Sequence, residues 1–221
     1  MNVQLKALIL DVGGVLILGH QSAGRTKWAD RLGVSLKELD SVMWNRPEAA
    51  RLSRGGMTFD EYWRLLGQEL GLTEAESLAM RGDYFSGDSV NDAAVALARQ
   101  AREAGFKVGI LSNAFGSLDQ LLESIGIRTL FDDVVDSWCV GMAKPEQQIY
   151  ELACRRLGVV PEEVLFVDDR TENVEAAAAL GMVALCYQSE TTLEAARNAL
   201  GLAPGRSRDE SSDPIGTAEV A

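Results

Sequence analysis

The feature of this sequence that most constrains its fold is an apolar run near the amino terminus, residues 5–10, which ends at an aspartate. The run is hydrophobic at every position except Lys6, so it predicts a strand that is buried in a parallel sheet. Asp11 follows directly, and Gly13 and Gly14 come next. Open α/β sheets bind ligands beyond the carboxyl ends of their strands, and glycine lets backbone approach a ligand closely. Asp11 is therefore a candidate site residue, although an aspartate that ends a strand is also a common turn residue.

Further polar residues suited to phosphate or a metal ion stand where two later apolar runs end and where a helical pattern between them begins. They are Ser112 and Asn113 after the run 106–111, Lys144 before Pro145, and Asp168, Asp169 and Asn173 after the run 164–167. Because parallel strands point the same way, their carboxyl ends meet at one edge of the sheet. We therefore expect a cation, several hydrogen-bond donors and a cluster of carboxylates to gather at that edge.

The order of these residues resembles that of the haloacid dehalogenase-like hydrolase superfamily over about residues 3–190. It is most similar to the phosphatase branch that includes the N-terminal domain of soluble epoxide hydrolase and bacterial sugar-phosphate phosphatases. The resemblance implies a Rossmann-like α/β core with a doubly wound parallel sheet and a small helical cap inserted after the first strand. It also implies a Mg²⁺-dependent hydrolysis of phosphate monoesters, with a small phosphorylated metabolite such as a sugar phosphate as the substrate.

The resemblance implies catalytic and metal-binding roles for four residues. Asp11 is the expected nucleophile, which forms an aspartyl-phosphate that water then cleaves, and Lys144 is the expected catalytic cation beside it. Mg²⁺ is expected to bind Asp11, Asp169 and the Gly13 carbonyl oxygen. This ion usually keeps several waters beside one or two carboxylates, so such a small set of protein ligands is adequate.

Five further roles concern the phosphate group and the support of the metal site. Ser112, Asn113 and Lys144 are expected to bind phosphate oxygens, with the start of the following helix behind the first two. Asp168 and Asn173 are expected to orient the metal-binding residues or to act as alternate ligands.

One position departs from the family pattern. Most phosphatases of the superfamily carry a second aspartate two places after the nucleophile, where it protonates the leaving group and activates water, and here that position is Gly13. General acid–base help is typically worth about 10²- to 10⁴-fold in rate, so slow turnover is expected unless another group substitutes. His20, the only histidine, is a candidate substitute, alongside an ordinary surface or linker role.

This gap leaves two other functions open. The first is a 2-haloacid dehalogenase, from a branch of the superfamily that works without metal, but the pair of Asp168 and Asp169 favours metal and phosphate. The second is a non-catalytic phospho-ligand-binding relative, but binding alone does not require the nucleophile Asp11. A dinucleotide-binding oxidoreductase is disfavoured, because the glycine pair does not extend into a GxGxxG pattern.

The chain is expected to divide discontinuously into a core and a cap. Residues 1–17 and 91–202 are predicted to form the core, and residues 18–90, with apolar positions three or four apart, the helical cap. The polar stretch 203–221 has little to bury, and we expect it to be disordered.

Substrate choice is expected to reside in the cap, because a cap of this kind closes over the site. Two capping-box patterns, Thr58 with Glu61 and Thr73 with Glu76, predict starts of its helices. The candidate substrate contacts are Met43, Trp44, Arg46, Arg51 and Arg54. The glycine pair, Gly55 and Gly56, would let the loop of the cap approach the site. An arginine that pointed into the site could clasp a second anionic group, although such arginines are more often solvated.

Composition and charge bear on the partners and the compartment. The formal net charge of −12 at pH 7 disfavours nucleic acid and anionic membranes as partners. No apolar stretch is long enough to span a bilayer, and the first residues do not read as a secretory leader. The three cysteines, Cys139, Cys154 and Cys186, lack metal-ligand spacing. We expect a reduced cytoplasmic protein, as a monomer or a homodimer.

Overall fold

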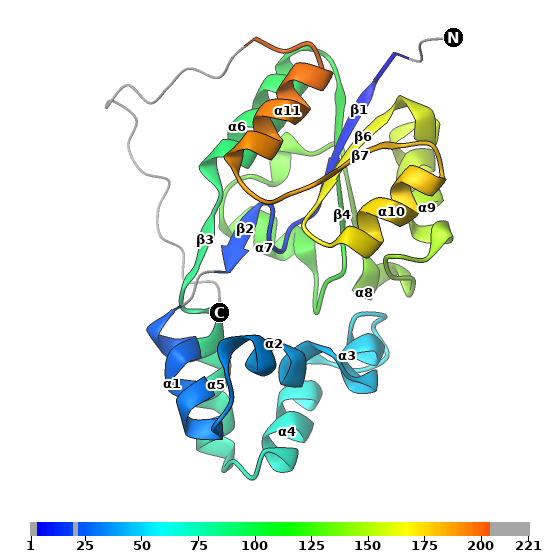
Figure 1. Ribbon diagram of the computed structural model, residues 1–221. Helices are drawn as coiled ribbons and strands as arrows, with labels where there is room; N and C mark the ends of the chain where they lie inside the picture. The colour runs from blue at the N-terminus through cyan, green and yellow to red at the C-terminus, as the bar shows by residue number, and fades with distance from the viewer. Residues whose placement is uncertain (1–3, 20–21, 204–221) are drawn as a thin grey trace.

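The computed structural model describes residues 4–19 and 22–203 of the 221-residue chain. The expectations for His20 and for the tail beyond residue 203 lie outside these residues. Within the described ranges, no helix is long and apolar enough to cross a membrane. Figure 1 shows a sheet flanked by helices, joined to a second group of helices that contains no strand of that sheet.

The larger part is built on a five-stranded parallel sheet with the strand order β5-β4-β1-β6-β7. Its strands are β1 (Ala7–Leu10), β4 (Lys107–Ser112), β5 (Asp133–Asp136), β6 (Val164–Asp168) and β7 (Val183–Cys186). The central strand β1 pairs with both β4 and β6, so Leu10 lies opposite Ile110 on one side and Val167 on the other. The three predicted apolar runs are therefore neighbouring strands, and their carboxyl ends lie at one edge, which we call the carboxyl edge.

Helices cover both faces of this sheet (Figure 1). One face carries α6 (Asp92–Glu103), α7 (Leu118–Ser124) and α11 (Glu190–Ala199), and the other α9 (Gln147–Leu157) and α10 (Thr171–Ala179). Alternate residues of β1 supply the two cores: Leu8 and Leu10 face the first group, and Ala7 and Ile9 the second. All four are fully buried, which explains the continuous apolar run. The predicted Rossmann-like α/β core is confirmed.

Three short helical segments complete this part of the chain. They are η1 (Arg128–Leu130), α8 (Ser137–Val140) and η2 (Pro161–Glu163). Of these, α8 directly follows β5, so it begins at the carboxyl edge.

The predicted helical insert after the first strand is also confirmed. Its helices are α1 (Ala23–Leu32), α2 (Leu36–Trp44), α3 (Pro47–Leu52), α4 (Phe59–Glu69) and α5 (Glu74–Phe85). A small antiparallel pair of strands, β2 (Ile17–Gly19) and β3 (Asp88–Val90), carries the chain into and out of the insert. The sequence pattern had not predicted this pair of strands.

Local signals explain where the cap helices begin and end. Both predicted capping boxes are present: Thr58 and Thr73 accept from the backbone N–H groups of Glu61 and Glu76, each at 3.2 Å, and both glutamates bond back. The long helical pattern early in the cap is divided at Gly33, whose φ of 69° ends α1 in a left-handed cap. The apolar faces of these helices pack around one aromatic-rich core of their own.

Candidate active site

Asp11 lies directly after β1 at the carboxyl edge and is 6 % exposed. Its Oδ1 accepts a hydrogen bond from the Val12 N–H at 2.7 Å and lies 2.9 Å from Lys144 Nζ. Burial raises the pKa of Asp11; the Lys144 ammonium opposes that rise, and the Asp168 carboxylate adds to it. A side-chain hydrogen bond from Ser112, the last residue of β4, also lowers this pKa. Lys144 and Ser112 therefore favour the ionised form that a nucleophilic carboxylate needs.

Lys144 is buried between two carboxylates. Its Nζ pairs with Asp168 as well as with Asp11, and only 1 % of its side chain is exposed. Asp168 has no exposed surface, and the Asn173 side-chain amide donates to its two oxygens at 2.9 and 3.1 Å. The Arg170 N–H adds a bond at 2.9 Å. A buried ion pair is favourable only where additional hydrogen bonds satisfy its atoms, and this network meets that condition.

Asn113 holds the backbone of Lys144. Its side-chain oxygen accepts the Lys144 N–H at 2.8 Å, and its amide nitrogen donates to the Lys144 carbonyl oxygen at 3.0 Å. Both ends of this amide are thus bonded to the backbone of the residue whose ammonium group pairs with Asp11. The expected helix start behind Ser112 and Asn113 is wrong, because α7 begins only at Leu118.

Asp169 completes a cluster of three carboxylates. Asp11, Asp168 and Asp169 each place one oxygen within 4.8 Å of the others. Asp169 is an exposed residue, but its carboxylate lies against Gly14, where an added Cβ would stand 2.4 Å from Oδ2. Burial of this carboxyl group and the charges of Asp11 and Asp168 raise the pKa of Asp169 to about 6. A divalent cation would relieve this repulsion, and carboxylate oxygens are the ligands that Mg²⁺ prefers.

The two glycines after Asp11 differ in what they require. The Gly14 N–H donates to the Ile17 carbonyl at 2.8 Å, and the φ of Gly14 is 77°, a value that side chains rarely adopt. The φ of Gly13 is not in that region, and a Cβ there would meet nothing within 4 Å. The position at which the family pattern has its second aspartate therefore has room for a side chain, whereas Gly14 does not.

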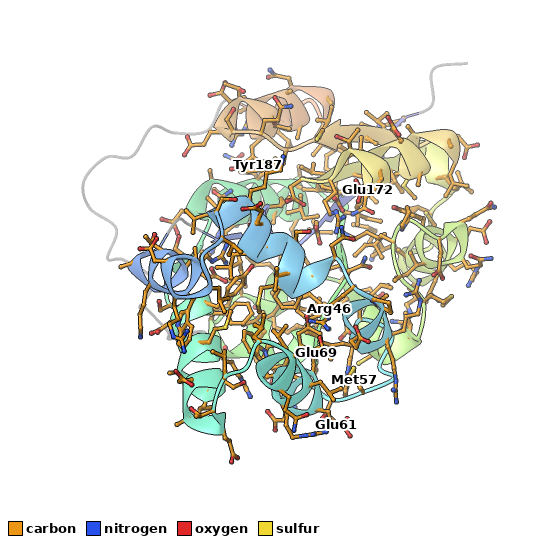
Figure 2. All side chains as sticks on the ribbon, turned by 60° about the horizontal axis from the view of Figure 1, so that its bottom comes forward. Arg46, Met57, Glu61, Glu69, Glu172 and Tyr187 are labelled. Carbon is orange, nitrogen blue, oxygen red and sulfur yellow. The ribbon has the colours of Figure 1, made fainter. Side chains whose placement is uncertain are left out.

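The candidate arginines of the cap are occupied by other groups. Arg46 pairs with Glu69, its neighbour in Figure 2, and also bonds to a second glutamate in α3. Arg51 donates from Nε to a backbone carbonyl at 2.8 Å. Arg54 pairs with Glu146 of the core, so it joins the cap to the loop that follows Lys144.

The apolar candidates have two different positions. Met43 is fully buried inside the cap, so it supports the fold of the cap. Trp44 is half-buried and stacks on Phe115, with ring centroids 4.4 Å apart and planes at 4°. Phe115 belongs to the core, in the loop between β4 and α7 that extends toward the cap (Figure 1).

Gly55 brings the cap against α8. An added Cβ at Gly55 would lie 2.4 Å from the Trp138 carbonyl oxygen, and the Trp138 indole donates to the Met57 carbonyl at 3.4 Å. Sequence reasoning missed both core residues, Phe115 and Trp138. Each follows a strand that ends at the carboxyl edge. That position in the sequence could have identified both residues as neighbours of the site.

Comparisons with known proteins agree with this geometry. The model of the haloacid dehalogenase-like hydrolase family matches residues 5–181. A sesquiterpene phosphatase from Aspergillus oryzae is 32 % identical over 187 residues, which cover 84 % of this chain and 91 % of that protein. The bifunctional epoxide hydrolase 2 of Sus scrofa is 26 % identical over 208 residues, which cover 85 % of this chain but 37 % of that protein.

A solved structure has the same fold. It is that of a haloacid dehalogenase family enzyme from Bacteroides thetaiotaomicron in complex with magnesium and inorganic phosphate. The TM-score is 0.66 at 19 % identity, and the alignment covers 83 % of this chain and 94 % of that one. The family match, the relatives and the shared fold together place this chain in the haloacid dehalogenase-like hydrolase family, as an enzyme of its phosphatase type.

Proposed function

We propose that this enzyme is a Mg²⁺-dependent phosphatase that hydrolyses a small phosphate monoester through an aspartyl-phosphate on Asp11. A sugar phosphate is one candidate substrate. The observation that carries the proposal is the placing of Asp11 at the carboxyl edge, 2.9 Å from Lys144 Nζ and within a cluster of three carboxylates. A carboxylate is a weak nucleophile and repels a phosphate dianion, so it needs positive charge on both sides.

The donor set fits a magnesium ion. Asp11, Asp169 and the Gly13 carbonyl oxygen would hold it, with Asp168 as an alternate ligand, because carboxylate oxygens already converge within 4.8 Å. When bound, the ion supplies positive charge that offsets the repulsion between the Asp11 carboxylate and the phosphate oxygens. Asn173 and Arg170 would hold Asp168 in place through the bonds described above.

The remaining residues of the site bind and orient the phosphate. Lys144 would pair with a phosphate oxygen, and Ser112 and the Asn113 backbone would donate hydrogen bonds to the other oxygens. An Asp11 oxygen attacks phosphorus, the P–O bond to the organic group breaks, and water then cleaves the acyl phosphate and restores the carboxylate. Since Gly13 cannot supply a proton to the leaving oxygen, esters of acidic alcohols should react fastest.

The division of the chain follows from the same proposal. Residues 1–17 and 91–202 would form the catalytic core and residues 18–90 a cap that excludes water during the reaction. Three free cysteines among the described residues support a reduced, cytoplasmic setting, with the protein as a monomer or a homodimer. The net charge of −12 supports a small-molecule partner rather than nucleic acid or a membrane surface.

The test is hydrolysis of p-nitrophenyl phosphate by the purified protein, with Mg²⁺ and with EDTA. This ester needs no general acid, so the enzyme should release nitrophenol with Mg²⁺ only. Asp11→Asn should lower kcat by at least about 10³-fold. The matched control is Asp60→Asn, at a cap aspartate whose side chain is 85 % exposed, which should leave the rate unchanged.

Two results would contradict the proposal. No nitrophenol release under either condition would favour a non-catalytic phospho-ligand-binding protein. Metal-independent release of chloride from 2-chloropropionate would favour a 2-haloacid dehalogenase.

A further inference from the structure

The substrate's organic group has one direction in which to extend. The phosphate would sit on Asp11 at the carboxyl edge, and the strand that leads to Asp11 is fully buried between two helical layers. The group bonded to the phosphate must therefore project away from the sheet, toward the cap. What the cap and the edge present to each other decides which organic groups fit.

The cap and the carboxyl edge meet through aromatic side chains, which we call the aromatic junction. Its members are Trp44, Phe59 and Phe85 from the cap and Phe115 and Trp138 from the core. The ring centroids of Trp44 and Phe115 are 4.4 Å apart in a stacked pair, and those of Trp44 and Phe85 are 6.3 Å apart. The ring of Phe59 is nearly parallel to that of Phe115, with centroids 6.4 Å apart. All five residues are half-buried.

Phe115 places this junction close to the reacting atoms. It stands three residues after Ser112, whose side chain bonds to Asp11. Three residues of extended chain span at most about 11 Å, so the Cα atoms of Ser112 and Phe115 are no farther apart than that. The Trp44–Phe115 stack therefore lies within reach of an extended organic group attached to the phosphate.

The junction offers no free hydrogen-bonding group from its own side chains. The Trp44 indole N–H donates to the Tyr84 hydroxyl at 2.8 Å, and the Trp138 indole N–H donates to the Met57 carbonyl. The three phenylalanines have none. Burying a sugar hydroxyl against these rings would leave it without a partner, which is unfavourable.

The three cap arginines that were candidates for binding a second anionic group already have partners within the protein. Arg46 and Arg54 pair with glutamates, and Arg51 donates to a backbone carbonyl. The net charge of −12 also disfavours a further anion. A bisphosphate or a phosphorylated acid is therefore disfavoured.

We propose that the substrate is a monophosphate ester of an apolar alcohol, with an aromatic or isoprenoid group bound against Trp44 and Phe115. This inference rests on the proposed phosphatase function and narrows its substrate class. Sugar phosphates and glycerol phosphates take second place, because their hydroxyls find no partners at the junction. Aromatic rings favour contact with flat or unsaturated hydrocarbon over contact with hydroxyl-rich groups.

The test compares kcat/KM for 3-phenylpropyl phosphate and citronellyl phosphate with kcat/KM for ribose 5-phosphate and glycerol 3-phosphate, all with Mg²⁺. All four are esters of primary alcohols, so differences in the leaving group do not explain a preference. Acetyl phosphate, which has almost no organic group to reach the junction, reports phosphoryl transfer by itself. The apolar esters should be favoured by about tenfold or more, since a hydrophobic contact of modest size discriminates to that extent. Phosphate release is measured directly in every case.

Variants assign the preference to the junction. Trp44→Leu and Phe115→Leu should each lower the ratio of apolar to polar kcat/KM by about tenfold, mainly through KM. Trp44→Phe, which keeps a ring at that place, should retain most of the preference. The matched control is Phe106→Leu, at the amino ends of the strands beside Lys107, which should leave the ratio unchanged. Thermal unfolding of each variant verifies the fold.

The outcomes separate the two proposals. If acetyl phosphate is hydrolysed but the polar esters are preferred, or if Phe106→Leu changes the ratio as much as Phe115→Leu does, the substrate class is wrong and the phosphatase function stands. If no compound releases phosphate, the proposed function fails and the substrate class fails with it.

Discussion

The carboxyl edge and the aromatic junction lie beside each other but are built in opposite ways. At the edge, the ionisable side chains of Lys144 and Asp168 are buried, and each is held by several hydrogen bonds and ion pairs. In the cap, charged groups such as Arg54 pair at the surface, and half-buried rings face the core. Buried charges require one geometry, whereas apolar contacts tolerate many partners. Under our proposals, the chemistry resides at the carboxyl edge and the selection of the organic group at the aromatic junction.

The largest expected effect comes from removing the buried charge. Lys144→Met leaves Asp11 and Asp168 facing each other without a cation. It should lower kcat by about 10³-fold and the free energy of unfolding by about 3 kcal/mol. Lys6→Met is the matched control, since Lys6 pairs with Glu163 while 59 % exposed, and it should change neither quantity appreciably. Urea unfolding measures the free energy of unfolding, and p-nitrophenyl phosphate turnover measures kcat. If Lys6→Met lowered either quantity as much as Lys144→Met does, the contrast between the buried and the exposed lysine would be contradicted.

A smaller loss is expected where the turn after Asp11 is disturbed. Gly14→Ala puts a side chain at a φ of 77° and its Cβ 2.4 Å from Asp169 Oδ2. The strain is about 1–2 kcal/mol, and displacement of Asp169 should lower activity by about 10²-fold and raise the Mg²⁺ concentration needed for half-maximal rate. Gly13→Ala, with nothing within 4 Å of the new Cβ, should behave like the parent enzyme. The rate of each variant is measured as a function of Mg²⁺ concentration. Equal curves for Gly13→Ala and Gly14→Ala would contradict the close approach of Gly14 to the Asp169 carboxylate.

The next effect tests how the core positions its cation. Asn113→Ala removes the two bonds to the Lys144 backbone and should lower kcat by about tenfold, because it acts through Lys144. Asn198→Ala, at an exposed position of α11, is the matched control. If Asn113 instead bound the phosphate with its side chain, KM would rise at unchanged kcat.

The smallest expected effect is a gain. Gly13→Asp introduces a carboxyl group at the position of the general acid, into open space and without a left-handed backbone. It should raise the rate on alkyl phosphates by up to about tenfold and leave p-nitrophenyl phosphate unaffected, because only poor leaving groups need a proton. A parallel gain on both esters would show that the new group acts in some other way.

The sequence predicted the parts of the molecule that depend on local pattern. The apolar runs predicted that strands end near Asp11, Ser112 and Asp168. A central strand is buried on both faces, so its sequence is hydrophobic without interruption. Capping boxes such as Thr58 with Glu61 involve residues three positions apart, and the structure has them.

Other parts depend on pairs that are distant in sequence. The bonds of Asn113 to Lys144 join residues 31 positions apart, and the stack of Trp44 on Phe115 joins the cap to the core. Periodicity reports that a residue is buried and does not report which residue it contacts. For the same reason, the sequence did not predict that Arg54 pairs with Glu146.

The most direct measurement of the central claim is the chemical state of Asp11 during turnover. The enzyme is mixed with Mg²⁺ and p-nitrophenyl phosphate, quenched in acid within the first turnovers, digested and examined by mass spectrometry. A phosphoryl group on the peptide that contains Asp11, absent from the Asp11→Asn variant, is the predicted result. Steady turnover with no phosphoryl group on that peptide, or with the group on another residue, would contradict it.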